Sequence, residues 1–334
     1  MFNWSQFINY LSANDINVPT VAVWGLGNHA KNRILPTLAA LDEVRLLGVC
    51  SRSADTVIEM ANQWDCYGWY SSEEMLSHPD LDVVYIASPI ALHYSMASQA
   101  LKAGKHVWCE KPLTCDSRDT KALVSLAEKH GKVLNESFMY LYHPQFKKVK
   151  KFVDESKDIK SVVCRFGLPD IAAPGFRNDP KLCGGAFWDV ASYNISALLA
   201  LFPDQQVELL FSELIQKKGS PVDNEGRAIL RFSNGVTAYL EWAIGVAYKN
   251  EIDLWSIDGS MFTDKIFSKP VGYKPTFYLR DLNGNIHLEE EEECDQFMEM
   301  FRYFADMMGD DVRIMAERQS ILRRAELMCD IVNF

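Results

Sequence analysis

The sequence has no excess of basic residues: 34 lysines and arginines stand against 45 aspartates and glutamates, a formal net charge of -11. This balance argues against a nucleic-acid partner or an anionic membrane surface, because both attract basic proteins. No apolar run approaches the roughly 18–20 residues of a membrane-spanning helix. Residues 1–20 also lack a basic segment followed by a long apolar core, so we expect no secretory signal, no membrane partner and a cytoplasmic location.

Paired cysteines are also missing. The chain has eight cysteines, but none forms a CxxC pair. Neither a zinc site nor a disulfide framework is indicated by this scatter. We therefore expect reduced, mostly buried thiols and no bound metal. The cysteines stand at positions 50, 66, 109, 115, 164, 183, 294 and 329.

The first 140 residues alternate short apolar runs with segments of helical periodicity. This alternation is typical of βαβ units, in which a parallel sheet is covered by helices on both faces. We expect an α/β Rossmann domain over residues 1–145, which starts with a short amphipathic helix that contains Phe2 and Leu11. The expected strands are residues 20–27, 44–51, 82–88, 106–112 and 132–138.

From about residue 158 the pattern changes to longer runs in which apolar and polar residues often alternate. Asn234-Gly235 separates two of these runs, and Asn-Gly is the strongest short-range hairpin signal. Asn283-Gly284 marks a second turn. We therefore expect an α+β domain with a mostly antiparallel, open-faced sheet over residues 146–334.

The segment "GLGNHA" follows the first apolar run and matches the G-x-G-x-x-A pattern of dinucleotide-binding loops. In such loops the first glycine allows a tight turn, the second lets the backbone approach a pyrophosphate, and the small third residue lets helix and strand pack closely. The amides at the start of the following helix then face the phosphate charge. The candidate cofactor contacts are Gly25, Leu26, Gly27, Asn28, His29 and Ala30.

The end of the second expected strand bears on the choice of cofactor. NAD-dependent enzymes usually place an acidic residue there, which binds the ribose 2′-hydroxyl, whereas an arginine accommodates a 2′-phosphate. This chain has Ser51 and Arg52 at that place and no acid. The sequence therefore favours NADP(H) over NAD(H).

Three further motifs follow the glycine loop in order: "AGKHVWCEKPL", "NESFMYLYHPQ" and "GGAFWDVASYNI". With the glycine loop they resemble the glucose–fructose oxidoreductase/inositol dehydrogenase (Gfo/Idh/MocA) family over nearly the whole chain. The resemblance implies an NAD(P)-dependent oxidoreductase that acts on the CH-OH group of a small carbohydrate. It also implies a homodimer or homotetramer, often formed through the open face of the second sheet. Trp242, Tyr248 and Trp255 are candidates for that face or for the core.

The resemblance implies that Lys111 lies beside the nicotinamide and the reacting substrate carbon. An ammonium there would stabilise the charge that develops on the substrate oxygen. Asp189 and Tyr193 are four residues apart and should share one helical face. Many relatives have histidine in place of Tyr193; a tyrosine can donate a proton, and a nearby lysine would lower its pKa. We assign Lys111, Asp189 and Tyr193 to catalysis and, together with Arg177, to substrate binding.

Other positions follow from the resemblance with less force. Ser88, Pro89 and His93 occupy the loop after the third strand, where Ile90 replaces an asparagine that is common in the family. Glu110 and Glu136 stand at the ends of the next two strands. The candidate cofactor contacts from these loops are Ser88, Pro89, His93, Glu110, Lys111 and Glu136.

Three functions remain open from the sequence. The first is NADP(H)-dependent reduction of a carbohydrate carbonyl, with a nucleotide-linked keto-sugar among the candidate substrates. The second is a pyranose or trans-dihydrodiol dehydrogenase that works in the oxidative direction. The third is a non-catalytic dinucleotide-binding sensor or repressor on the same fold. The presence of Lys111, Asp189 and Tyr193 together favours catalysis over the sensor.

Overall fold

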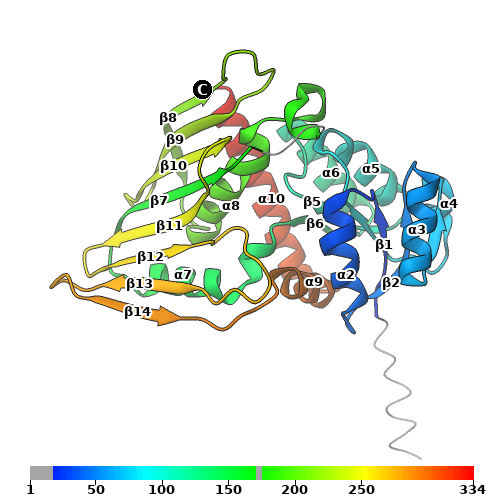
Figure 1. The fold of residues 1–334 in the computed structure, drawn as a ribbon, viewed down its shortest axis with the longest axis horizontal. Helices are drawn as coiled ribbons and strands as arrows, with labels where there is room; N and C mark the ends of the chain where they lie inside the picture. The colour runs from blue at the N-terminus through cyan, green and yellow to red at the C-terminus, as the bar shows by residue number, and fades with distance from the viewer. Residues whose placement is uncertain (1–17, 171–174) are drawn as a thin grey trace, which may run out of the picture.

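The chain forms two sheets that lie beside each other, with helices between and around them (Figure 1). The computed structural model describes residues 18–170 and 175–334. The amphipathic helix predicted around Phe2 and Leu11 lies outside these residues.

The first sheet is parallel throughout, with strand order β3-β2-β1-β4-β5-β6. Its central strands are buried on both faces, as continuous apolar runs require in a sheet covered by helices. The predicted Rossmann architecture is confirmed, with one short edge strand, β3, that the sequence did not indicate. The strands are β1 (Thr20–Trp24), β2 (Arg45–Cys50), β3 (Tyr67–Trp69), β4 (Val83–Ile86), β5 (His106–Glu110) and β6 (Leu134–Ser137).

Helices connect these strands and cover the sheet. Three of them have side-chain N-caps, which are Ser53, Ser71 and Asp116. Each cap accepts a backbone N–H from the first turn of its helix. The helices are η1 (Ala30–Ile34, a π-helix), α2 (Leu35–Ala39), α3 (Ala54–Trp64), α4 (Ser72–Ser77), α5 (Ile90–Lys102) and α6 (Ser117–Lys129).

The second sheet has the strand order β14-β13-β12-β11-β7-β10-β9-β8. Only the β7–β10 pair is parallel, so the predicted mostly antiparallel sheet is confirmed. Gly235 and Gly284 adopt positive φ angles in the two predicted turns. The strands are β7 (Ile159–Leu168), β8 (Val207–Ile215), β9 (Glu225–Phe232), β10 (Thr237–Ile244), β11 (Lys249–Ser256), β12 (Ser260–Asp264), β13 (Thr276–Arg280) and β14 (Ile286–Glu290).

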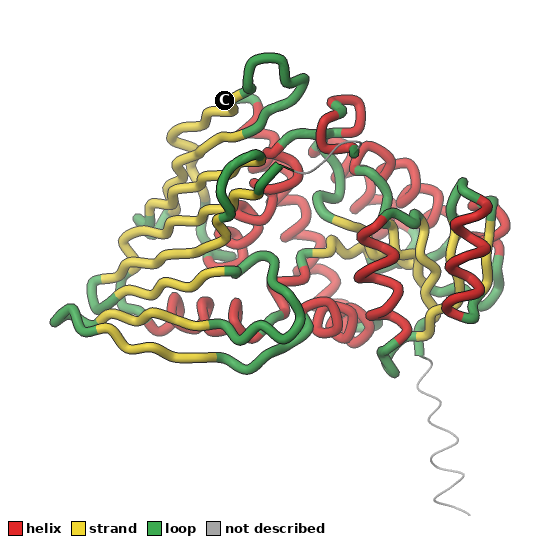
Figure 2. The backbone as a smooth tube through the Cα atoms, viewed as in Figure 1, coloured by secondary structure: helices red, strands yellow, loops and turns green. Residues whose placement is uncertain are grey.

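One face of the second sheet is covered by helices and the other is open (Figures 1 and 2). Trp242 is only 2% exposed and belongs to the core, whereas Trp255 is 63% exposed on the open face. The remaining helices are η2 (Met139–Tyr142), α7 (Pro144–Glu155), η3 (Phe176–Asn178), η4 (Pro180–Leu182), η5 (Phe187–Ala191, a π-helix), α8 (Ser192–Leu201), α9 (Gln296–Met307) and α10 (Asp311–Val332).

The last two helices return to the first sheet. On α9, Phe301 packs against Tyr85 and Trp108 of that sheet. On α10, Ile321 joins the core on the other side of the sheet. Two stretches of sequence that are far apart therefore build the first domain.

A buried ion pair fixes α10 in place. The Arg324 guanidinium donates to the Glu136 carboxylate at 2.8 Å and to Glu317 at 3.0 Å. Glu136 also accepts the Leu113 N–H at 2.8 Å, so α10 is tied to both β6 and the loop that follows β5.

Candidate active site

Eight of the seventeen predicted site residues meet in one cavity between the two domains. The cavity has a volume of about 270 Å³ and lies beyond the C-terminal ends of β4 and β5. Ligands bind at this edge in open α/β sheets. The first domain contributes His29, Ala87, Ser88, Ile90, His93, Glu110 and Lys111, and the second contributes Phe166, Leu168, Phe176, Arg177, Asp189, Tyr193 and Ser268, with Met139 between them.

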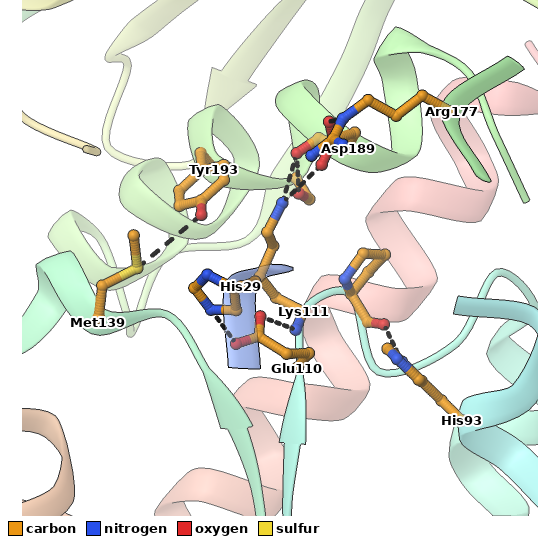
Figure 3. A network of polar contacts seen from close by, with 10 residues as sticks. His29, His93, Glu110, Lys111, Met139, Arg177, Asp189 and Tyr193 are labelled. Carbon is orange, nitrogen blue, oxygen red and sulfur yellow. Dashed lines mark hydrogen bonds and ion pairs between the residues drawn. The ribbon is translucent and has the colours of Figure 1, made fainter. Parts of the chain in front are cut away.

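Lys111 and Asp189 form an ion pair that joins the two domains (Figure 3). The Lys111 ammonium donates to the Asp189 backbone carbonyl at 2.6 Å and to its carboxylate at 3.1 Å. Arg177 donates to the other carboxylate oxygen at 2.6 Å. Burial alone would raise the pKa of the Asp189 carboxyl, but Lys111 and Arg177 hold it below its usual value. The carboxylate is therefore ionised and holds both cations at the cavity wall.

Tyr193 lies on the same side of its helix as Asp189, with the Lys111 ammonium 4.3 Å from the centre of its ring. Its hydroxyl is 3.8 Å from the Met139 sulfur. Burial raises the pKa of this hydroxyl well above its usual value, and Glu110 and Asp189 raise it further. The expected lowering of the pKa by a nearby lysine is therefore wrong, because burial dominates. Tyr193 stays protonated and can act as a proton donor.

Gly184 and Gly185 precede the helix that bears Asp189 and Tyr193. Each has to be glycine for a different steric reason. A Cβ atom at Gly184 would lie 2.5 Å from the Phe176 carbonyl oxygen, so glycine lets the loop that carries Arg177 approach closely. A Cβ atom at Gly185 would lie 2.1 Å from the Asp223 carboxylate. That carboxylate accepts the Phe187 N–H at 2.7 Å and so fixes the start of the helix that bears Asp189.

The predicted phosphate loop has the expected form. Gly25 has a φ of 107°, and a Cβ atom there would lie 2.7 Å from the Ala87 carbonyl oxygen, so the fold itself requires glycine. At Gly27 an added Cβ atom would meet nothing within 4 Å in the described part of the chain. Glycine at position 27 is thus not needed for packing, and it leaves space for a ligand at the helix start. This fits the close approach of a pyrophosphate.

The other residues of the glycine loop differ in how far their side chains are exposed to solvent. Asn28 and His29 are exposed at the first helical turn, whereas Ala30 is buried between helix and strand. The Leu26 side chain belongs to the core, so only its backbone is able to face a ligand.

Ser51 and Arg52 follow β2 at the same edge of the sheet. Arg52 is exposed and forms no ion pair with residues 18–170 or 175–334. Its guanidinium is therefore able to bind a phosphate group. Together with the glycine loop, this tip fits a dinucleotide that carries a 2′-phosphate.

Glu110 joins the glycine loop to the first sheet. Its carboxylate lies 2.8 Å from the His29 ring nitrogen and accepts the Tyr85 hydroxyl at 2.5 Å. Burial would raise the pKa of Glu110, but His29, Tyr85 and Lys111 lower it to about 2. The carboxylate is thus ionised beside both His29 and Lys111.

His93 is fully buried and joins two loops of the first domain. Its ring nitrogens lie 3.0 Å from the Pro112 carbonyl oxygen and 2.9 Å from the Ser88 carbonyl oxygen. Burial lowers the pKa of the ring, which favours the neutral form. His93 therefore supports the loop that carries Lys111, and both its nitrogens face protein groups. Pro89 stands at the start of α5 and is absent from the cavity wall.

The structure contradicts the expectation for Glu136. Both of its carboxylate oxygens are occupied, one by the Leu113 N–H and the other by Arg324, and the residue is only 4% exposed. Glu136 lies outside the cavity wall and is a structural counter-ion.

The expectation of fully reduced cysteines is also wrong. Cys115 and Cys183 form a disulfide between residues that are 68 apart in the sequence. The other six cysteines are free.

Two further findings concern the described residues alone. They contain no group of histidine, cysteine or acidic side chains arranged to hold a metal ion. None of their helices combines the length and the apolar character that crossing a membrane requires.

Several residues at the site gave no signal in the sequence. Asp223 and Ser268 lie in loops of the second sheet without a motif, and Phe166 and Leu168 look like ordinary strand residues. Only the fold brings them to the cavity. Asp179, in the loop that carries Arg177, accepts the Lys181 N–H at the start of η4.

Comparison with known proteins gives a consistent result. Residues 20–138 match a family model described as "Oxidoreductase family, NAD-binding Rossmann fold", and residues 146–261 match the "GFO/IDH/MocA C-terminal domain". The chain is 30% identical over 318 residues to dTDP-3,4-didehydro-2,6-dideoxy-alpha-D-glucose 3-reductase of Streptomyces violaceoruber, which covers 92% of this chain and 93% of that protein. It is 29% identical over 248 residues to scyllo-inositol 2-dehydrogenase (NADP(+)) of Bacillus subtilis. This match covers 72% of this chain and 74% of that protein.

Solved structures agree with these matches. The 3-ketoreductase KijD10 from Actinomadura kijaniata, in complex with NADP and TDP-benzene, superimposes with a TM-score of 0.87 at 28% identity and covers 94% of this chain and 97% of its own. Structures of KijD10 also include a variant with a lysine replaced by alanine and one with a tyrosine replaced by phenylalanine. Aldose-aldose oxidoreductase from Caulobacter crescentus shares the fold, with a TM-score of 0.83 at 21% identity, covering 94% of this chain and 97% of its own.

Gly25 is required by the fold, whereas Gly27 leaves space for a ligand. This difference can be tested directly. We expect Gly27→Ala to keep the thermal stability of the protein but to weaken NADPH binding by roughly tenfold or more, because the new methyl group occupies space next to the helix N-terminus. Gly25→Ala should instead destabilise the fold by about 1–3 kcal/mol, since its backbone is strained for any other residue. Thermal unfolding and fluorescence titration measure the two effects. Equal loss of stability in both variants would contradict this assignment.

Proposed function

The chain belongs to the Gfo/Idh/MocA family of oxidoreductases, and from this membership and its site we propose that it transfers a hydride between NADP(H) and a carbohydrate carbonyl or hydroxyl group. The observation that carries the proposal is the convergence of Lys111, Asp189 and Tyr193 at the sheet edge next to the glycine loop. NADP(H), when bound, supplies or accepts the hydride through its nicotinamide ring. Residues 25–30, Ser51, Arg52, Ser88 and Glu110 are the candidates to hold it.

Each polar group has a role that follows from its position. The Lys111 ammonium, fixed by Asp189, donates a hydrogen bond to the substrate oxygen and stabilises the negative charge that develops there. Tyr193 is the proton donor to that oxygen in the reductive direction, because its raised pKa keeps the hydroxyl protonated. Arg177 uses one N–H on Asp189, and the rest of its guanidinium is available to a substrate hydroxyl or anionic group.

The similarity to keto-sugar reductases favours reduction of a nucleotide-linked keto-sugar. A second candidate is the oxidation of a pyranose or a cyclic polyol, which is supported by similarity to D-xylose 1-dehydrogenase (NADP(+)) of Haloferax volcanii and to the inositol dehydrogenase. The same residues serve both directions by microscopic reversibility. A sensor without catalysis has no need for a buried lysine, aspartate and tyrosine around one cavity.

We also propose that the protein is cytoplasmic.

Arg52 provides the test of cofactor choice. We expect the protein to bind NADPH much more tightly than NADH, and Arg52→Ala to weaken NADPH binding by roughly 10- to 100-fold, since a charged hydrogen bond contributes about 1.5–3 kcal/mol. NADH binding should not change. Arg45→Ala, at the opposite end of the same strand, is the matched control. Fluorescence titration measures both affinities, and a preference for NADH would overturn the role of Arg52.

Lys111 provides the test of catalysis. Turnover of NADPH with a keto-sugar substrate should fall by about 10²–10⁴ in Lys111→Ala, because the charge on the substrate oxygen is no longer stabilised. NADPH affinity should stay close to that of the wild type. Lys102→Ala, an exposed lysine of the same domain, is the control. Loss of cofactor binding together with turnover would indicate a structural role for Lys111 instead.

We also propose that the protein is a homodimer formed through the open face of the second sheet. One row of facing residues crosses all eight strands and is apolar except for Asp253. The adjacent row alternates in charge, and its neighbouring members form ion pairs within the chain. The apolar row is Phe211, Ile229, Tyr239, Val163, Asp253, Phe262, Tyr278 and Leu288, and the charged row is Glu213, Arg227, Glu241, Arg165 and Glu251.

Sedimentation velocity at micromolar concentration tests this assembly. The wild type should sediment as a dimer, or as a tetramer built from such dimers. Tyr239→Glu should shift the dimer towards monomer because it puts an unpaired charge in the centre of the apolar row. Val312→Glu, at a position that is 76% exposed on α10, should leave the assembly unchanged. A monomeric wild type would refute the proposed interface.

A further inference from the structure

The disulfide between Cys115 and Cys183 joins the two domains at the edge of the active-site cavity. Cys115 lies in the first domain, four residues after Lys111, in the loop between β5 and α6. Cys183 lies in the second domain, six residues before Asp189, at the end of η4. The two Cα atoms are 6.5 Å apart. The bond therefore crosses the cleft between the chain segments that carry Lys111 and Asp189.

The bond holds a loop that forms part of the cavity wall. We call residues 175–184 the bridging loop. Its Phe176 and Arg177 line the cavity, and the Arg177 carbonyl accepts the Gly185 N–H at 2.8 Å. The loop also contacts α5 of the first domain through η4. A covalent link at Cys183 thus adds a fixed point to a loop that otherwise meets the first domain through non-covalent contacts.

A structural staple is not needed here. Disulfides are common in small secreted domains with little core, whereas this chain has two extensive apolar cores. Three of the free cysteines, Cys50, Cys109 and Cys164, are buried. Burial raises the pKa of Cys50 to about 12 and that of Cys109 well above its usual value, so these thiols are unreactive.

Cys115 and Cys183 differ from these three buried cysteines in solvent exposure, and Cys183 also has an unusual backbone conformation. Both are only partly buried, so a thiol reagent is able to reach them. Cys183 has a φ of 56°, in the left-handed region that favours glycine or asparagine. A cysteine at this place is therefore not explained by local backbone preference, and the cross-link across the cleft gives a reason for it.

We propose that Cys115 and Cys183 form a reversible covalent latch, which holds the cleft closed over the cofactor when oxidised and lets it open when reduced. In the reductive step a dithiol attacks one sulfur of the pair. The S–S bond breaks, two electrons and two protons pass to the cysteines, and the dithiol becomes a disulfide. In the reverse step glutathione disulfide oxidises the cysteine pair. It takes up two electrons and two protons and leaves as two molecules of glutathione, and the S–S bond between Cys115 and Cys183 forms again.

The latch acts on the exchange of ligands, since the cleft has to open before a molecule held between the domains can leave. Release and lid opening commonly limit the rate of such enzymes. The oxidised protein should therefore release NADPH more slowly than the reduced protein. This expectation rests on the proposed binding of NADP(H), but it does not depend on the identity of the sugar.

The experiment starts with the full-length protein treated with glutathione disulfide or with dithiothreitol. Peptide mapping under non-reducing conditions should show the Cys115–Cys183 cross-link only after oxidation. Hydrogen exchange in residues 176–184 should be faster in the reduced form. The NADPH dissociation rate constant, measured by stopped-flow displacement with excess NADP⁺, should rise by roughly threefold or more on reduction.

Single-residue variants serve as controls. Cys115→Ser and Cys183→Ser should each behave like the reduced wild type and no longer respond to dithiothreitol. Cys294→Ser removes a partly buried cysteine elsewhere and should keep the full response. Free thiols at both positions after oxidation, or equal exchange and dissociation rates in the two states, would overturn the proposal. Peptide mapping and hydrogen exchange need no cofactor, so they distinguish failure of the latch from failure of the proposed function.

Discussion

The Lys111–Asp189 ion pair is the interaction on which the arrangement of the molecule depends. Each domain contributes one charge, and the side chains of both residues are 9% exposed. Such a buried pair adds little net stability, but separating its members would leave a buried charge unpaired at a cost of about 3–5 kcal/mol. The geometry of the site and the packing of the two domains are therefore one constraint. Arg177 balances the second carboxylate oxygen, and Tyr193 places its ring beside the ammonium.

The two helices that begin at the site are built in a similar way. Each follows a glycine with positive φ, Gly25 in one case and Gly185 in the other, and each contains a π-helical segment near its start. π-helical turns are frequent at functional sites. At Gly25 the glycine avoids a backbone carbonyl, and at Gly185 it leaves room for a capping carboxylate. Close packing on the protein side sets the direction of both helices, so their first turns point to the space where ligands are proposed to bind.

The sequence predicted the fold class, both glycine-marked hairpin turns and the segments that supply Lys111, Asp189 and Tyr193, because periodicity and local motifs determine these features. It failed where the partner of a residue lies far along the chain. Glu136 stands at a strand end, as a ligand contact would, but Arg324 is 188 residues away and neutralises it. Cys115 and Cys183 likewise gave no motif. The pKa of Tyr193 depends on burial, whose extent a motif does not reveal, and Asp223 reached the helix start only through the second sheet.

The return of α9 and α10 to the first sheet has a consequence for how the protein is made. Phe301 and Ile321 complete the two faces of that sheet, and Arg324 supplies the counter-ion of Glu136. The ribosome has to synthesise the chain as far as residue 324 before all of these residues are available. The first sheet, although its strands are synthesised earlier, therefore cannot reach its final packing until the segment that contains Phe301, Ile321 and Arg324 has left the ribosome, and the two domains complete their folding together.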